Sequence, residues 1–186
     1  MAVVGYGALA CSDPVPLPAQ GAINTQVSAV SPPVQGKACS AGASFTYDVP
    51  QVREDHPDDV LDDGTYIYKV IDGDNNATVK CSVKGGPVFN FSGNIVLNGE
   101  GMEVTGGTVD ATLKGTATIT IKNSQHLSSS LISPPSSCAI DIVTTNAGPQ
   151  VKAGSMWAHF SCPAVEAPPS DSCAAQGYFV FENCAQ

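Results

Sequence analysis

The chain has 186 residues, of which 42% are hydrophobic and only 13% are charged, and its net charge is −9. The acidic balance argues against nucleic-acid binding, which requires basic patches, and against adhesion to anionic lipid by charge. The low charged fraction, with 18 Gly and 14 Pro, disfavours helical bundles and favours strands joined by turns. The length suits one domain with extensions.

The N-terminal segment is apolar and ends in a cysteine. Residues 1–10 resemble the end of a signal peptide, and Ala8-Leu9-Ala10-Cys11 resembles a lipobox, before whose cysteine signal peptidase II cleaves. We therefore predict Cys11 as a lipidation site, carrying acyl chains such as palmitate. No Lys or Arg precedes Cys11, so the usual basic start of a signal peptide is missing. The alternative is an N-terminal strand that ends in a disulfide.

The next segment is rich in proline. Between residues 12 and 44, five prolines alternate with Ser, Ala, Gln and Gly, a composition typical of extended, poorly packed chain. We expect a lipid-anchored tether over residues 11–44 and a domain over residues 45–186, with Cys39 joining the end of the tether to the domain. The sequence has no run of about 18 or more apolar residues, so it predicts no membrane-spanning helix.

The domain shows the period of two that is typical of strands. Residues 108–122 carry Val, Ala, Leu, Gly or Ile at each odd position and Thr, Asp or Lys at each even one. This predicts one half-buried antiparallel strand, bent or bulged at Gly115. Similar alternation predicts strands at residues 78–83 and 88–98, and further strands are expected at 65–71, 101–105, 138–145, 150–161 and 177–183.

Turn residues separate these strands. Hairpin signals occur at residues 72–76, 85–86, 98–99 and 106–107, and the one predicted helix covers residues 57–63. The predicted fold is therefore all-β: an antiparallel β-sandwich or open barrel of about eight to nine strands, stapled by disulfides.

The seven cysteines contain no C-x-x-C motif, which disfavours zinc and thioredoxin-like sites. Scattered cysteines in a chain with few charges predict disulfides and an oxidising compartment. Because seven is odd, Cys11 is set apart as the lipid site. The six predicted disulfide cysteines are Cys39, Cys81, Cys138, Cys162, Cys173 and Cys184.

Several runs resemble known envelope proteins. ATVKCSV at 77–83, FNFSG at 89–93 and MWAHFSC at 156–162 resemble the mycobacterial surface lipoprotein antigens. Cys173 and GYFVFENC at 177–184 resemble lipoproteins of myxobacteria. The resemblance covers about half the chain and contains no catalytic motif. The resemblance implies a small β-fold behind a lipid anchor, with two strand cysteines paired, and it implies no activity.

Six cysteines allow fifteen connectivities, so their spacing cannot choose among them. Odd and even positions along a strand point to opposite faces. This alternation places Cys81 on the inward face of its strand, and Cys162 continues an inward face as well. The resemblance points to the same two residues, and we predict the pair Cys81–Cys162. Its rival is Cys81–Cys138, since Cys138 also faces inward, and the other pairings stay open.

Two acidic segments could hold a cation. Six of the seventeen acids lie within residues 54–63, and packed carboxylates gain from a hard cation such as Ca²⁺. The alternative is a solvated acidic loop, and the spacing is not that of an EF-hand. Residues 72–76 are a weaker candidate, because a hairpin turn explains them better. The candidate metal ligands are Asp58, Asp59, Asp62 and Asp63.

Catalytic signals are sparse. The three histidines are His56, His126 and His159, and no G-x-S-x-G elbow accompanies them. Aromatic residues could instead stack on sugar rings, although strand aromatics usually pack in the core. The candidates for such a glycan platform are Tyr66, Tyr68, Trp157 and Tyr178.

These features lead to one main functional prediction. The chain is expected to be a non-enzymatic lipoprotein of the cell envelope, outer membrane or cell surface, with a structural, adhesive or display role. It is anchored to the membrane through lipid, and its partner is an envelope protein or a glycan. The first alternative is a ligand-binding module for glycan or Ca²⁺, and the second is a small secreted hydrolase.

Overall fold

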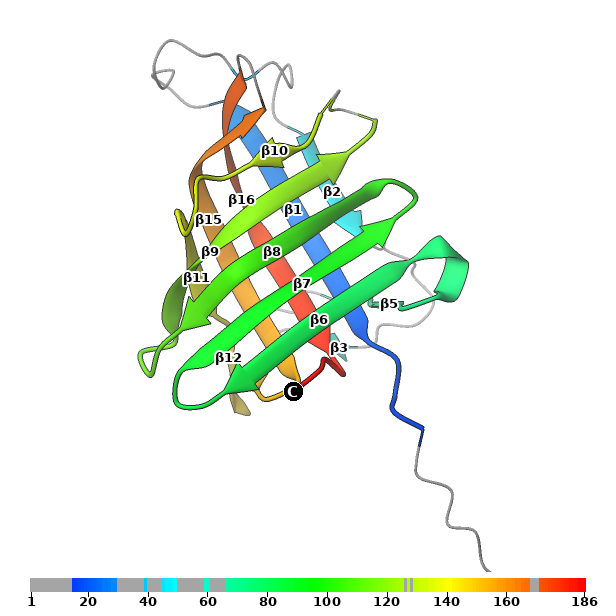
Figure 1. Cartoon of the computed structure of the whole chain (residues 1–186), viewed down its shortest axis with the longest axis vertical. Coiled ribbons are helices and arrows are strands. Elements are labelled where there is room, and N and C mark those ends of the chain that lie inside the picture. Colours follow the sequence, from blue (N-terminus) through cyan, green and yellow to red (C-terminus); the bar gives the residue numbers. More distant parts are fainter. Residues whose placement is uncertain are drawn as a thin grey trace, which may run out of the picture.

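The computed structural model confirms the all-β, antiparallel, disulfide-bonded class (Figure 1). Nearly all the strands lie in one sheet that curls over itself, as expected of a sandwich or open barrel. The residues that the structure describes are 15–29, 39, 45–49, 59–60, 66–125, 127, 129–167 and 171–186.

The sheet has two layers whose strands cross steeply (Figure 1). The front layer is a meander of four strands: β6 (Thr78–Gly85), β7 (Phe89–Leu97), β8 (Glu100–Val109) and β9 (Lys114–Asn123). The back layer follows the order β2 (Phe45–Val49), β1 (Gln20–Ala29), β16 (Asp171–Glu182) and β15 (Ser155–Ala167).

Two short strands join the layers along one side. β10 (Leu131–Ile132) and β11 (Cys138–Ile142) each pair with both β9 and β15. The sheet therefore turns the corner from front to back without a break in its hydrogen bonding.

The C-terminal residues form a seam along the opposite side. The backbone N–H of Val83, on edge strand β6, donates to Ala185 O at 3.0 Å, and the N–H of Ala185 donates to Cys81 O at 3.0 Å. The N–H of Gly154 also donates to Val83 O at 2.9 Å. These bonds occupy edge groups that would otherwise be open to another chain.

The remaining elements are short. β5 (Val70–Ile71) pairs with β1 and β14 (Val151–Lys152) pairs with β15. Two further hairpins join β3 (Asp59–Val60) to β4 (Tyr66–Ile67) and β12 (Thr144–Thr145) to β13 (Gly148–Pro149). A 3-10 turn, η2 (Asp74–Asn76), lies in the predicted turn at 72–76.

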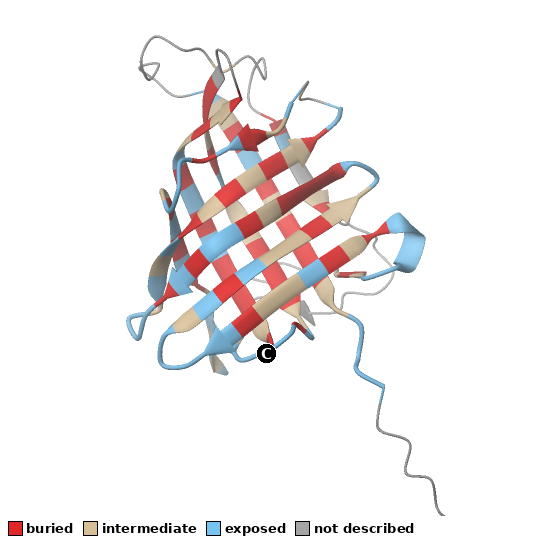
Figure 2. Ribbon diagram, in the orientation of Figure 1, coloured by how far each residue is buried: buried red, intermediate tan, exposed pale blue. Residues whose placement is uncertain are grey.

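The core fills the space between the layers. Alternate residues of each strand point inward, which gives the banded burial pattern of Figure 2. Phe179 lies at its centre, with its ring centroid 6.0 Å from that of Phe91 in the front layer and 5.1 Å from that of Phe181. Ile23, Val27, Ile119 and other residues close around these rings, each at most 1% exposed.

The prediction of one strand over residues 108–122 is wrong. β8 ends at Val109, a turn with left-handed Leu113 (φ 65°) follows, and β9 begins at Lys114. Val109 lies opposite Gly115, so odd positions face inward on both sides of the hairpin and the alternation passes through the turn unbroken. The predicted hairpin at residues 106–107 is instead a bulge inside β8.

Two further predictions need correction. Residues 20–29, within the predicted tether 11–44, form strand β1, which pairs with β16 along its whole length. Its apolar residues belong to the core, and the prolines lie only outside the strand. Within the predicted helix 57–63, Asp59–Val60 pair with β4 as a strand, and the rest lies outside the described residues.

Candidate functional site

The structure contains three disulfides: Cys39–Cys173, Cys81–Cys184 and Cys138–Cys162. All six predicted cysteines therefore pair, but the predicted partner of Cys81 and its rival are both wrong. Three intrachain disulfides indicate an oxidising compartment outside the cytoplasm.

Strand neighbourhood explains the pairing. Ala139 of β11 lies opposite Ser161 of β15, so Cys138 and Cys162 face each other one step along the same two strands, with Cα atoms 4.2 Å apart. Cys81 lies on edge strand β6, where the C-terminal seam brings Cys184 to it. Parity identified inward faces, but it could not say which strands are neighbours.

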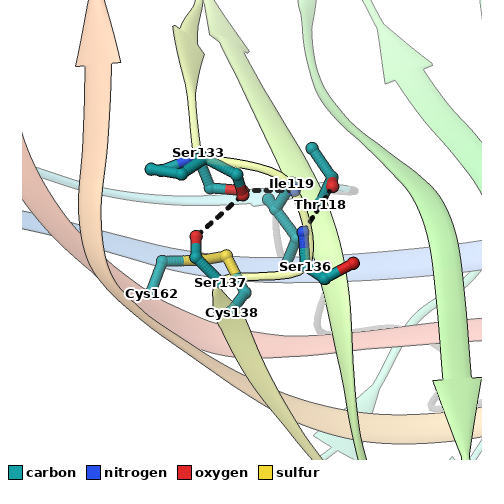
Figure 3. Close-up of a disulfide and its surroundings, with 8 residues drawn as sticks. Thr118, Ile119, Ser133, Ser136, Ser137, Cys138 and Cys162 are labelled. Atoms are coloured by element: carbon teal, nitrogen blue, oxygen red, sulfur yellow. Dashed lines mark hydrogen bonds between the residues drawn. A yellow bond between two sulfur atoms is a disulfide. The ribbon is translucent and has the colours of Figure 1, made fainter.

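A polar loop covers the Cys138–Cys162 bridge (Figure 3). The N–H of Ile119 donates to Ser133 Oγ at 2.9 Å, and the N–H of Ser136 donates to Thr118 Oγ1 at 2.9 Å. These bonds fasten residues 133–137 to β9, so the serines near the bridge have a structural role.

The predicted anchor and most of the predicted metal site are not described by the structure. Cys11, Asp58, Asp62 and Asp63 lie outside the described residues, and of Asp59 only the backbone, in β3, is described. Within the described ranges, no group of three or more His, Cys, Asp or Glu could hold a metal ion. None of these residues forms a helix long and apolar enough to cross a membrane.

The weaker acidic candidate, residues 72–76, behaves as a turn. Asp72 Oδ1 accepts the N–H of Val79 at 2.9 Å, and the N–H of Ala77 donates to Asp74 O at 2.7 Å. The carboxylate of Asp72 thus fixes the start of β6.

The structure brings two of the predicted glycan-platform aromatics together. Trp157 and Tyr178 lie on the outer side of the back layer, in a small cluster with Ala22 and Val180. Trp157 is only 8% exposed, so its ring face is not available to a sugar. Its Nε1 donates to Glu182 Oε1 at 3.3 Å.

Glu182 also forms an ion pair that closes this cluster. Its Oε2 lies 2.8 Å from Lys69 Nζ, and the Lys69 side chain is only 8% exposed. Of the remaining predicted aromatics, Tyr68 is half-buried and the Tyr66 side chain lies outside the described part of the chain.

A shallow groove of about 300 Å³ lies beside this cluster on the outer back layer. Its side walls come from β1, β16 and β15. The polar side chains that line it are Asn24, Gln26, His159, Ser161 and Gln176. The sequence prediction missed the β1 residues because it assigned residues 20–29 to the tether; the alternation of Ile23, Thr25 and Val27 with polar residues was the available signal.

A second groove of about 300 Å³ lies on the outer front layer. It is lined by Lys80, Ser82, Ser92 and Asn94, with Glu103 and Thr105 on its far side. Glu103 Oε2 lies 3.4 Å from Lys122 Nζ. Its described lining residues include no aromatic ring.

The residue types of a hydrolase triad share one face of the back layer. Asp141 of β11 lies opposite His159, and Ser161 follows two positions later on β15. No hydrogen bond joins these three described side chains, and Asp141 Oδ1 lies 3.4 Å from Lys114 Nζ. His159 contacts Tyr178 instead. The set therefore does not show the nucleophile–base contact that acyl transfer uses.

Comparisons of the chain with protein-family models, with curated proteins and with solved structures found no match.

Proposed function

We propose that this chain is a non-enzymatic lipoprotein of the cell envelope, anchored through Cys11, whose β-domain has a structural, adhesive or display role. The observation that carries the proposal is the place where the chain enters the barrel. β1 begins at Gln20, nine residues after Cys11, at one end of the barrel.

Residues 15–19 continue the chain away from that end (Figure 1). Asn183 Nδ2 donates to Pro18 O at 3.1 Å, and the N–H of Asp72 donates to Ala19 O at 2.9 Å. These bonds fix the direction in which the chain leaves the barrel. Val15 and Leu17 are 88% and 72% exposed, so the chain before Pro18 does not pack on the domain.

The length of this segment sets the reach of the anchor. Nine residues span at most about 32 Å when fully extended. A lipid on Cys11 would hold this end of the barrel near the bilayer and leave the other end and both outer faces for contacts. The three disulfides use the six other cysteines, which is consistent with a separate role for Cys11.

The experiment compares the precursor with its Cys11→Ser variant, both preceded by the same complete signal peptide and expressed in a bacterium. The unchanged protein should incorporate labelled palmitate and sediment with membranes, whereas the variant should do neither. Ser12→Ala is the matched control and should behave like the unchanged protein. Equal fractionation of all three proteins, with no label in any, would overturn the anchoring proposal.

A further inference from the structure

We propose that the groove on the outer back layer is a binding site for a neutral oligosaccharide, of which it takes one or two sugar units. This inference rests on the proposed adhesive role only for the place where the glycan would be met, at the cell envelope. Binding itself is independent of the anchor and is tested on protein without lipid.

Strand register builds the site from two rows of side chains. Asn24 lies opposite Tyr178, which lies opposite His159, and these three form one row. Gln26 lies opposite Gln176, which lies opposite Ser161, and these three form the second row. The rows are about 7 Å apart along the strands, and each crosses about 10 Å from β1 to β15. A patch of this size matches one or two pyranose rings.

The second row presents paired hydrogen-bonding groups. Gln176 Nε2 donates to Gln26 Oε1 at 3.0 Å, which fixes both amides in place. The Nε2 of Gln26 and the Oε1 of Gln176 then provide a donor and an acceptor for a ligand. Neighbouring hydroxyls of a sugar ring each donate and accept, so they complement such a pair. Because the amides are already ordered, binding loses less side-chain entropy.

The first row adds the His159 ring to the lining of the groove, with Tyr178 beside it. The rings of His159 and Tyr178 are nearly perpendicular, at 89°, with centroids 6.4 Å apart. His159 is exposed, whereas Tyr178 is half-buried and packs against the Trp157 cluster, which holds it in place. The ring carbons of the exposed His159 suit the C–H face of a sugar, as in sites that combine apolar surface with a few polar groups.

Charge selects a neutral ligand. Asp48 flanks the groove on β2, where it accepts a hydrogen bond from Asn24 Nδ2, and Asp141 flanks it on β11. Lys114 offsets the charge of Asp141, so the carboxylate of Asp48, in a chain of net charge −9, is the group that disfavours anionic sugars. The front groove is lined by the charged residues Lys80 and Glu103 and has no aromatic ring among its described lining residues, so it fits this ligand class less well.

The test uses the full chain carrying Cys11→Ser, with its disulfides intact, on an array of neutral and sialylated oligosaccharides. We expect binding to at least one neutral glycan and none to the sialylated forms. Titration calorimetry with that glycan then compares two variants, Gln26→Ala with Gln176→Ala, and His159→Ala. Each should weaken binding about ten-fold or more.

The control is Ser82→Ala with Asn94→Ala in the front groove, which should bind the glycan as the parent does. All variants change side chains on the outer surface and should keep the parent melting temperature. Absence of binding to any neutral glycan at millimolar concentration would overturn the proposal. So would equal losses in the groove variants and the control, or a preference for sialylated glycans. Lipid labelling of Cys11 is measured separately, so failure of one proposal can be distinguished from failure of the other.

Discussion

Removal of the Cys81–Cys184 disulfide should open the C-terminal seam and destabilise the whole domain. The bridge links edge strand β6 to the C-terminal residues, whose backbone bonds to Val83 and Cys81 occupy that edge. The variant for this test is Cys81→Ala with Cys184→Ala, which leaves no unpaired thiol at either position.

The magnitude follows from the loop that the bridge closes in the unfolded chain. Cys81 and Cys184 are 103 residues apart, but Cys39–Cys173 already shortens the path between them. The chain then runs 42 residues from Cys81 back to Cys39 and 11 residues from Cys173 to Cys184, a loop of roughly 53 residues. Loop-closure entropy for that length predicts a loss of about 4 kcal/mol in unfolding free energy.

The assay is denaturant unfolding without reductant, together with amide hydrogen exchange. For a chain of this length, the melting temperature should fall by about 8–16 °C. The amides of Val83 and Ala185 should exchange faster, through local opening of the seam. The matched control is Cys138→Ala with Cys162→Ala, whose bridge closes 24 residues and whose loss should cost about 3.4 kcal/mol without local opening at the seam. A loss below about 1 kcal/mol, or unchanged exchange at Ala185, would refute this reasoning.

Three further changes test the packing and the turns. Ser133→Ala removes the acceptor of the buried Ile119 N–H and should lower the unfolding free energy by about 1–3 kcal/mol. The control is Ser137→Ala, at a half-buried residue whose hydroxyl donates to Pro134 O within the same loop, and equal effects in denaturant unfolding would contradict the assignment. Gly115→Ala would place a Cβ 1.7 Å from Thr108 O and should lower the unfolding free energy by about 1–3 kcal/mol. The control, Thr116→Ala, should change it by no more than about 0.5 kcal/mol. An unchanged unfolding free energy in Gly115→Ala would show that the β8–β9 contact is looser than described. Hydrogen bonds from the Thr112 hydroxyl and backbone N–H hold the pKa of Asp110 below its ordinary value. The stability that Asp110 contributes should therefore be present above its unfolded-state pKa and be lost as the pH falls through the lower, folded pKa; an NMR titration should show this lowered pKa and its return toward the ordinary value in Thr112→Ala.

Local pattern was enough to predict the class of this fold. Alternation at residues 78–83 and 88–98 predicted β6 and β7 because a strand with one buried face must alternate along its length. The hairpin residues at 98–99 mark the turn between β7 and β8, where Asn98 and Gly99 both have positive φ. The six disulfide cysteines could likewise be named from the sequence, because their number and spacing exclude other common roles.

Features that depend on neighbours distant in the chain could not be read from the sequence. Residues 20–29 carry the alternation of a strand between proline-rich flanks, but their partner β16, some 150 positions later, could not be read from the sequence. The hairpin between Val109 and Gly115 could not be recognised because odd-numbered residues face inward both before and after the turn.

The same limit applies to the disulfides and to the groove. Parity along a strand says which face a residue occupies, whereas only the order of strands in the sheet says which residues on that face meet. Cys81 meets Cys184, and Gln26 meets Gln176, because closure of the sheet brings the two ends of the chain together. Composition, periodicity and cysteine content were enough for the all-β class, the disulfide cysteines and the oxidising compartment, whereas the folded sheet sets the partners, since pairing is a property of the whole sheet.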